Sequence, residues 1–186
     1  MATKKRRAEF RLEQIATIKE VARDLIATNG ASGFSLREVA REMGVVSSAL
    51  YRYFATRDEL LSALVFDAYN DLGMAVEKAD SKLARSDIRG RFRATCSAVR
   101  KWAKANPHEY ALIYGTPVPG YEAPVGTIAA ATRVAVVLGR ILDDDQSFRL
   151  GKKRSNRSRL PDGVLDTSNI AQVMPGVPRE EYVRAL

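Results

Sequence analysis

Four polar side chains close together carry the chemistry that stands out in this chain: Ser47, Ser48, Tyr51 and Arg52. At about 100° per residue they fall on one side of a helix, and the other side is apolar: Ala49, Leu50, Tyr53 and Phe54. Hydroxyls and a guanidinium on a short polar face can form hydrogen bonds with the base edges and phosphates of a nucleic acid. The segment from Ser47 to Phe54 is therefore predicted to be a recognition helix.

The residues before this segment predict the elements that would position it. Ser35 and Glu38 form a capping box, and Phe34 and Val39 form a hydrophobic staple, so a first helix is expected to begin at Leu36. Three further positions complete a helix-turn-helix pattern, with a small residue, a turn glycine and an apolar plug: Ala40, Gly44 and Leu50. A second capping box, Thr56 to Glu59, predicts that a long helix follows at once.

At these residues the sequence resembles the TetR family of bacterial transcriptional repressors. The matching positions are Ala40, Gly44, Val45, Leu50, Tyr51, Phe54, Glu59 and Leu60. Two positions depart from the family pattern: Val46 stands where Ser often caps the helix, which would shift capping to Ser47, and Ser48 stands where Gly is frequent. The resemblance implies an all-α protein with an N-terminal helix-turn-helix domain and a helical regulatory and dimerisation domain.

The candidate DNA-binding set is Ser35, Arg37, Ser47, Ser48, Tyr51, Arg52, Tyr53 and Arg57. We assign base readout to Ser47, Ser48 and Tyr51, because contacts with base edges discriminate sequence. Arg37, Arg52, Tyr53 and Arg57 are assigned mainly to phosphates, which supply salt-sensitive affinity. Two alternatives remain: Arg57 as a solvated residue of the first helical turn, and Tyr53 as a core residue by its angle.

Charge supports an anionic partner. The 186 residues carry a formal net charge of +8, which leaves nucleic acid, membrane surface and ribosome open as partners. Residues 1–9 are basic and polar, without the apolar stretch of a secretion signal, so we expect a cytoplasmic protein. The single Cys96 agrees with a reducing compartment. We expect residues 1–9 to form a disordered arm that either reaches DNA or only aids solubility.

Periodicity predicts the remaining helices. A helix over 10–29 would pack behind the helix-turn-helix with Leu12, Ile15 and Ile18 on its buried face. Further helices are expected over 57–79, 87–105, 106–114 and 124–142. The last is nearly all apolar or small, yet Arg133 and Arg140 favour a bundle helix over a membrane span. Residues 143–178, including Asp143–Asp145 and the basic stretch 152–159, are expected to be a solvated, partly disordered or functional loop.

Residues 102–124 resemble the WHG type of TetR C-terminal domain through Trp102, His108 and Gly115. In such a domain Trp102, Tyr110 and Tyr114 could line a ligand cavity; equally, aromatics at helical spacing could be core residues. His108 is interpreted first as a helix-start residue. The resemblance also implies a final helix that completes a dimer interface. Residues 178–186 only begin such a helix, which leaves open whether the chain is cut short or dimerises through less surface.

Catalysis finds little support in the sequence. One His and one Cys, without a recognisable Ser-His-Asp set, phosphate-binding glycine loop or metal-spaced cluster, offer neither nucleophile nor Lewis acid. We therefore expect no enzyme, no cofactor and no metal.

These observations divide the chain into an arm and DNA-binding domain, 1–56, and a helical ligand-binding and dimerisation domain, 57–186. The hypothesis is a homodimeric repressor that leaves a palindromic operator when a small, largely apolar effector binds. The alternatives are a non-specific architectural DNA-binding protein without an effector and, through a cationic helix at 87–105, a protein that binds a membrane surface.

Overall fold

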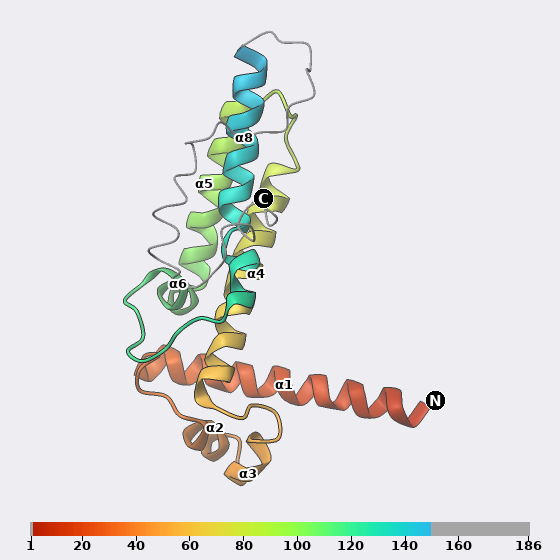
Figure 1. The fold of residues 1–186 in the computed structure, drawn as a ribbon, viewed down its shortest axis with the longest axis vertical. Coiled ribbons are helices and arrows are strands. Elements are labelled where there is room, and N and C mark those ends of the chain that lie inside the picture. Colours follow the sequence, from red (N-terminus) through yellow and green to blue (C-terminus); the bar gives the residue numbers. More distant parts are fainter. Residues whose placement is uncertain (1, 150–186) are drawn as a thin grey trace. The chain divides into compact units, whose positions relative to one another are not determined.

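The computed structural model describes the backbone of residues 2–149 and the side chains of residues 5–145. Within this range all regular secondary structure is helical, which confirms the expected fold class (Figure 1). The elements are α1 (Ala2–Asn29), α2 (Leu36–Glu42), α3 (Ser47–Leu50), α4 (Arg57–Asp80), α5 (Ile88–Ala105), α6 (Pro107–Tyr114), the 3-10 helix η1 (Val125–Thr127), α7 (Ile128–Ala131) and α8 (Arg133–Arg149). The basic stretch 152–159 and the expected last helix, 178–186, lie outside the described residues.

The chain forms two compact units. One comprises Met1–Tyr69 and Ala103–Thr127, and the other comprises Asn70–Trp102 and Ile128–Leu186. The helices α4 and α5 each contribute residues to both units. The first unit therefore joins the helix-turn-helix to α6 and the segment that follows it, although they are distant in sequence. The expected domain boundary at residue 56 remains a prediction.

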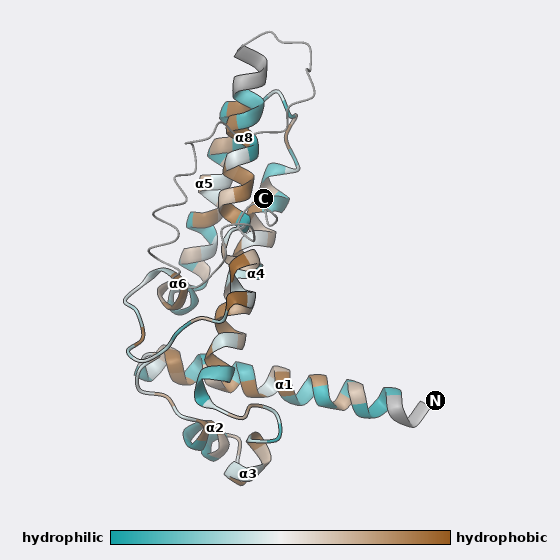
Figure 2. Ribbon diagram, viewed as in Figure 1, coloured by the Kyte–Doolittle hydropathy of each residue, from teal (hydrophilic) through white to brown (hydrophobic). Residues whose placement is uncertain are grey.

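The first unit is built on a buried apolar core. Fully or almost fully buried side chains come from α1 to α4: Ile18, Ala22, Val39, Leu50, Leu60 and Leu61. Burying each of the larger aliphatic side chains stabilises a fold by about 1.5 to 3 kcal/mol. The predicted staple residues Phe34 and Val39 both belong to this core. Figure 2 shows the corresponding recurrence of hydrophobic residues along α4.

The N-terminal end of α1 corrects one expectation. Residues 2–9 are not a disordered arm, because α1 is helical from Ala2 onward. Ala, Lys, Arg and Glu dominate this stretch and are strong helix formers, and Lys5 pairs with Glu9 at 3.9 Å across one turn. Leu12 was expected on the packed face but is 66% exposed, because this part of α1 extends beyond the core.

The recognition helix is shorter than the predicted segment 47–54. The helix α3 covers only Ser47–Leu50, and residues 51–53 form turns. The Leu50 carbonyl accepts hydrogen bonds from the amides of both Tyr53 and Phe54, at 2.8 and 3.0 Å, which closes the helix tightly. Ser47 is the first helical residue and not the cap; Val46 takes the cap position without a side-chain hydrogen bond.

Two expectations for the C-terminal helices are also wrong. The apolar segment 124–142 is not one helix: it divides into η1, α7 and the beginning of α8, with a break at Thr132. The Thr132 hydroxyl donates to the carbonyls of Ile128 or Ala129, which caps the end of α7. Beyond residue 142 the chain stays helical to Arg149, where a loop was expected. Among the described residues no single helix is long and apolar enough to cross a membrane. One bent pair of helical segments, Val125–Ala131 with Arg133–Asp145, is long and apolar enough together, by length and composition only.

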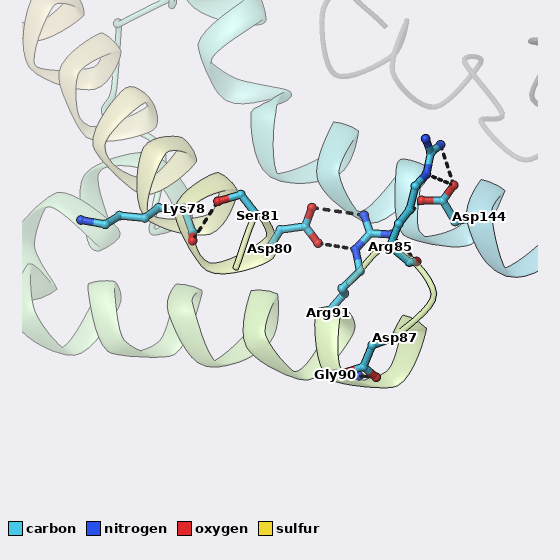
Figure 3. A network of polar contacts seen from close by, with 8 residues as sticks. All are labelled: Lys78, Asp80, Ser81, Arg85, Asp87, Gly90, Arg91 and Asp144. Atoms are coloured by element: carbon cyan, nitrogen blue, oxygen red, sulfur yellow. Dashed lines mark hydrogen bonds and ion pairs between the residues drawn. The ribbon is translucent and has the colours of Figure 1, made fainter. Parts of the chain in front are cut away.

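A buried ion-pair network explains why α8 continues (Figure 3). In the second unit, Arg91 donates through Nε and Nη2 to the Asp80 carboxylate at 2.8 and 3.1 Å, and through Nη1 to Asp144 at 2.7 Å. Arg85 adds a second partner for Asp144. The side chains of Arg91 and Asp144 are only 6% and 8% exposed. Asp144 was expected to be solvated, but it joins α8 to the start of α5 and, through Arg91, to Asp80 at the end of α4.

The charge on Asp144 is held by its partners. Burial alone would raise the pKa of this carboxyl group, but the hydrogen bonds and positive charges of Arg85 and Arg91 outweigh burial and lower its pKa. Because the pKa is lowered in the folded chain, the carboxylate stabilises the fold above its ordinary pKa of about 3.9 and loses this contribution as the pH falls.

A second clamp in the same unit joins α4 to α8. Arg133 donates to Glu77 through Nε at 2.8 Å and to the Asn70 side chain through Nη1 at 2.8 Å. Its aliphatic part lies over Gly73, where an added Cβ would come within 2.7 Å of the Arg133 Cδ. The hydrogen bond from Arg133 lowers the pKa of Glu77. Glycine at position 73 thus makes room for the arginine.

We expect Asp144→Asn to lower the free energy of unfolding by about 2 to 3 kcal/mol, because it leaves the buried Arg91 with an incomplete set of partners. Chemical denaturation measures this change. Asp143→Asn is the matched control, since Asp143 is the exposed neighbour on the same helix and should change stability by less than about 0.5 kcal/mol.

The pH dependence distinguishes the ion pair from a general effect of the substitution. The difference in stability between the wild type and Asp144→Asn should shrink as the pH falls below about 4, because the Asp144 carboxyl group becomes protonated first in the unfolded chain and, at lower pH, in the folded chain. A difference that stays constant down to about pH 2 would contradict the assigned role of Asp144.

Candidate nucleic-acid interface

The helix-turn-helix is held by local hydrogen bonds that the sequence predicts. The Ser35 hydroxyl accepts from the Glu38 amide at 3.3 Å and donates to the Glu38 carboxylate at 3.0 Å, which caps α2. Gly44 has φ +67°, the left-handed conformation that favours glycine in this turn. The Val45 amide then donates to the Ala40 carbonyl at 2.9 Å. These contacts fix the angle at which the chain enters α3.

The predicted polar face lies on the exposed side of α3 and its following turn. Leu50 and Phe54, 1% and 6% exposed, anchor the segment in the core. The structure gathers Ser48, Tyr51 and Arg52 on the exposed side, where Tyr51 is 48% accessible, and Ser47 is half-buried beside them. Arg37, on α2, is also exposed. Hydroxyls and cations in this arrangement can contact base edges and phosphates.

Two members of the predicted set have internal roles. The Ser35 hydroxyl is engaged in the α2 cap. Tyr53 is half-buried and packs against the core, and the Arg11 guanidinium lies 5.3 Å from its ring centroid. Contact of Ser35 or Tyr53 with DNA remains a prediction.

Arg57 has an extensive set of partners within the unit. Its Nε donates to the Phe34 carbonyl at 3.0 Å, its Nη2 donates to the Ala31 carbonyl, and its Nη1 pairs with Asp58 at 3.1 Å. The guanidinium also lies 5.1 Å from the Phe34 ring centroid. Arg57 therefore joins the start of α4 to the loop before α2, a role that sequence analysis did not predict, since the partners lie far away in the chain.

Sequence analysis also missed two residues at this surface. Val46, directly before α3, is 72% exposed, and its apolar side chain is suited to a thymine methyl group. Its position at the helix cap, where the TetR pattern often has a polar residue, was the available signal. Arg11 lies next to the recognition turn and donates to the Arg52 carbonyl at 3.4 Å. Helical periodicity of α1 could have placed it on that side.

The aromatic candidates for ligand binding form a cluster only in part. Tyr110 and Tyr114 have ring centroids 5.1 Å apart, and Tyr69 meets Tyr114 edge-on at 6.0 Å. The Tyr69 hydroxyl donates to the Ile113 carbonyl at 3.1 Å. Burial raises the pKa of both Tyr69 and Tyr114. Trp102 belongs to the other unit.

A hollow of the first unit lies elsewhere on α6. It has a volume of about 180 Å³ and lies between the C-terminal part of α1 and the start of α6, with His108 and Leu112 in its wall. None of the three predicted ligand-binding residues lines it. Ligand binding by Trp102, Tyr110 and Tyr114 therefore remains a prediction.

Ion pairs connect α6 to the DNA-binding helices within the first unit. Arg23 of α1 pairs with Asp67 of α4 and with Glu109 of α6, each at 3.0 Å. Lys19 adds a second contact to Asp67 at 2.9 Å. After α6, the Tyr121 hydroxyl donates to the Ser62 hydroxyl at 3.1 Å. A displacement of α6 would therefore alter contacts made by residues of α1 and α4.

Over the described residues the chain is all helical, with an N-terminal helix-turn-helix and an exposed polar side on α3, which is the architecture of a helix-turn-helix regulator. Comparisons with known proteins specify the family. A family model of bacterial regulatory proteins, tetR family, matches residues 18–64. A second model, tetracyclin repressor-like, C-terminal domain, matches residues 92–174. The chain belongs to the TetR family. The WHG type of C-terminal domain remains a prediction.

Relatives agree with this assignment. The HTH-type transcriptional regulator Rv1816 of Mycobacterium tuberculosis is 46% identical over 132 residues, which are 70% of this chain and 56% of the relative. The crystal structure of the putative regulatory protein SCO4313 is 33% identical, with a TM-score of 0.67 over 96% of this chain and 79% of that one. PfmR from Thermus thermophilus, a TetR family transcriptional regulator, is 25% identical, with a TM-score of 0.58 over 75% of each chain. This chain spans little more than half the length of the curated relatives.

We expect Arg57→Leu to lower the free energy of unfolding by about 1 to 3 kcal/mol, because two loop carbonyls lose a charged donor. Arg52→Leu is the matched control: Arg52 is exposed, and its loss should leave stability nearly unchanged. Thermal and chemical denaturation compare the two. If Arg57→Leu instead kept full stability and weakened DNA binding as much as Arg52→Leu, the predicted phosphate role would be favoured.

Proposed function

We propose that this protein is a homodimeric transcriptional repressor of the cytoplasm that binds a palindromic operator through α3 and releases it when a small, largely apolar effector binds. The observation that carries the proposal is that α3 and the turn after it expose a polar side, while Leu50 and Phe54 anchor the opposite side in the core. Dimers with this motif place two recognition helices in successive major grooves, about 34 Å or a multiple apart.

Within this proposal the DNA-binding residues divide into two groups. Ser47, Ser48 and Tyr51, with Val46 for apolar contact, read bases. Arg37 and Arg52 contact phosphates, because both are exposed cations beside the reading surface. The internal hydrogen bonds of Ser35 and Arg57 favour a supporting role for these two residues.

The regulatory part of the proposal rests on the connections of α6. An effector held beside the tyrosines of α6, or in the hollow at its start, would act on α1 and α4 through Glu109, Arg23 and Asp67. It weakens operator binding only if it binds better to the conformation with lower affinity for DNA, since equal affinity for both conformations shifts nothing. The proposed division of labour remains 1–56 for DNA contact and 57–186 for ligand binding and dimerisation.

Selection from random duplex DNA at physiological salt, with excess competitor, tests the proposal. An inverted repeat among the bound fragments would support a dimeric sequence reader. Strong, salt-dependent binding without enrichment would favour the non-specific architectural alternative, to which the net charge of +8 also points.

We expect Tyr51→Ala to reduce affinity for the selected duplex by about 1 to 3 kcal/mol and to leave non-specific binding nearly unchanged, because a base contact is lost. Competitive gel-shift titrations measure both affinities. Arg52→Gln is the control: it should weaken all duplexes similarly and reduce the salt slope by about 1. Uniform weakening by Tyr51→Ala would argue against direct readout by this residue.

A further inference from the structure

One side of α1 changes from apolar to basic residues where the N-terminal half of the helix extends beyond the core. Farther along the helix, Ile18 and Ala22 form its buried side. At about 100° per residue, Arg7 and Arg11 fall on this same side, within about 60° of those two residues. The side of α1 that is apolar where the helix packs on the core therefore carries cations where the helix extends beyond the core. In Figure 1 this half of α1 extends away from α2 and α3, and Figure 2 shows that it is largely hydrophilic.

The acidic residues of this part of α1 lie on one side of the helix. Glu9, Glu13 and Glu20 cluster on the side roughly opposite to Arg7 and Arg11. Lys5 is paired with Glu9 at 3.9 Å. Arg7 and Arg11 therefore lie on a side of α1 that has no acidic residue over positions 5–22, and this cationic surface attracts a polyanion.

Arg11 shows which way the cationic side faces. Its Nη1 donates to the Arg52 carbonyl at 3.4 Å, and its guanidinium lies 5.3 Å from the Tyr53 ring centroid. Both partners belong to the turn that follows α3. The cationic side of α1 thus faces the same part of the unit as the proposed reading surface, and Arg7 lies one turn farther out, exposed and on the same side.

We propose that the Arg7 side of α1 binds the DNA backbone next to the segment that α3 contacts. The inference rests on the proposed function, since it needs α3 on DNA. Arg7 and Arg11 are about 6 Å apart along the helix axis, comparable with the rise of two base pairs at about 3.4 Å each. A phosphate contact by Arg7 extends the footprint and adds affinity without adding sequence specificity.

The experiment compares Arg7→Gln with Arg6→Gln in the full chain. Both variants remove one positive charge from adjacent exposed residues, but Arg6 lies on the acidic side of α1. The probe is the duplex enriched from random DNA or, without enrichment, a mixed-sequence duplex of the same length. Affinity is measured from about 50 to 200 mM salt, and hydroxyl-radical footprints are recorded on the enriched duplex.

We expect Arg7→Gln to reduce the salt slope by about 0.9, so that over this range the wild type loses about 3.5-fold more affinity than the variant. Its footprint should lose protection at the outer edge and keep it over the half-site centre. Arg6→Gln should match the wild type in both measurements.

Equal effects of the two variants would overturn the inference, because they would reflect net charge alone, and so would an unchanged Arg7→Gln. These outcomes leave the proposed function intact, since the wild type still binds. Failure of the wild type to bind any duplex would reject the proposed function first, and the inference with it.

Discussion

The recognition element depends on an anchor, because a helix as short as α3 has no stability of its own in water. Leu50 and Phe54 hold α3 in a core that α1, α2 and α4 contribute, and Gly44 sets the direction from which the chain arrives. The exposed hydroxyls of Ser48 and Tyr51 consequently have a fixed spacing without a long helix beneath them. Removing the core contacts would leave polar side chains with no defined direction.

The same core connects a distant part of the chain to the reading surface. Leu112, Val118 and Tyr121 are half-buried against it, so α6 and the segment behind it are packed into the unit that carries the helix-turn-helix. Arg23 forms ion pairs with both Asp67 and Glu109, so a movement of Glu109 alters the partners of an α1 residue directly. Ion pairs that remain partly exposed contribute only about 1 kcal/mol each, so these contacts could exchange in the regulation proposed above at little cost in free energy.

Local chemistry accounts for what the sequence predicted well. The Ser35–Glu38 box, the second box at Thr56 and Glu59, and the turn at Gly44 involve residues within a few positions of one another. The structure confirms the turn and the Ser35 and Thr56 caps, whereas the carboxylates of Glu38 and Glu59 accept from the Ser35 hydroxyl and the Ala55 amide instead of the expected backbone amides of Ser35 and Thr56. The polar and apolar sides of α3 follow from the same short-range periodicity. Of the candidate site, the exposed members Ser48, Tyr51 and Arg52 could be placed in this way.

The differences from prediction arise where a partner is distant in sequence. A run of three aspartates predicts a solvated loop when only neighbouring residues are considered. In the structure, however, Asp144 pairs with Arg91, which lies 53 residues away, and this buried ion pair stabilises the continuation of α8 beyond residue 142. Likewise, an arginine at the start of a helix suggests a phosphate contact, but the loop before α2 places the Phe34 and Ala31 carbonyls around Arg57. In both cases a charged side chain becomes part of the framework because the fold supplies buried polar partners, and burying an arginine without them would be costly. Charge alone therefore does not identify the residues that reach DNA; the cations that remain exposed around α3 are the ones available to it.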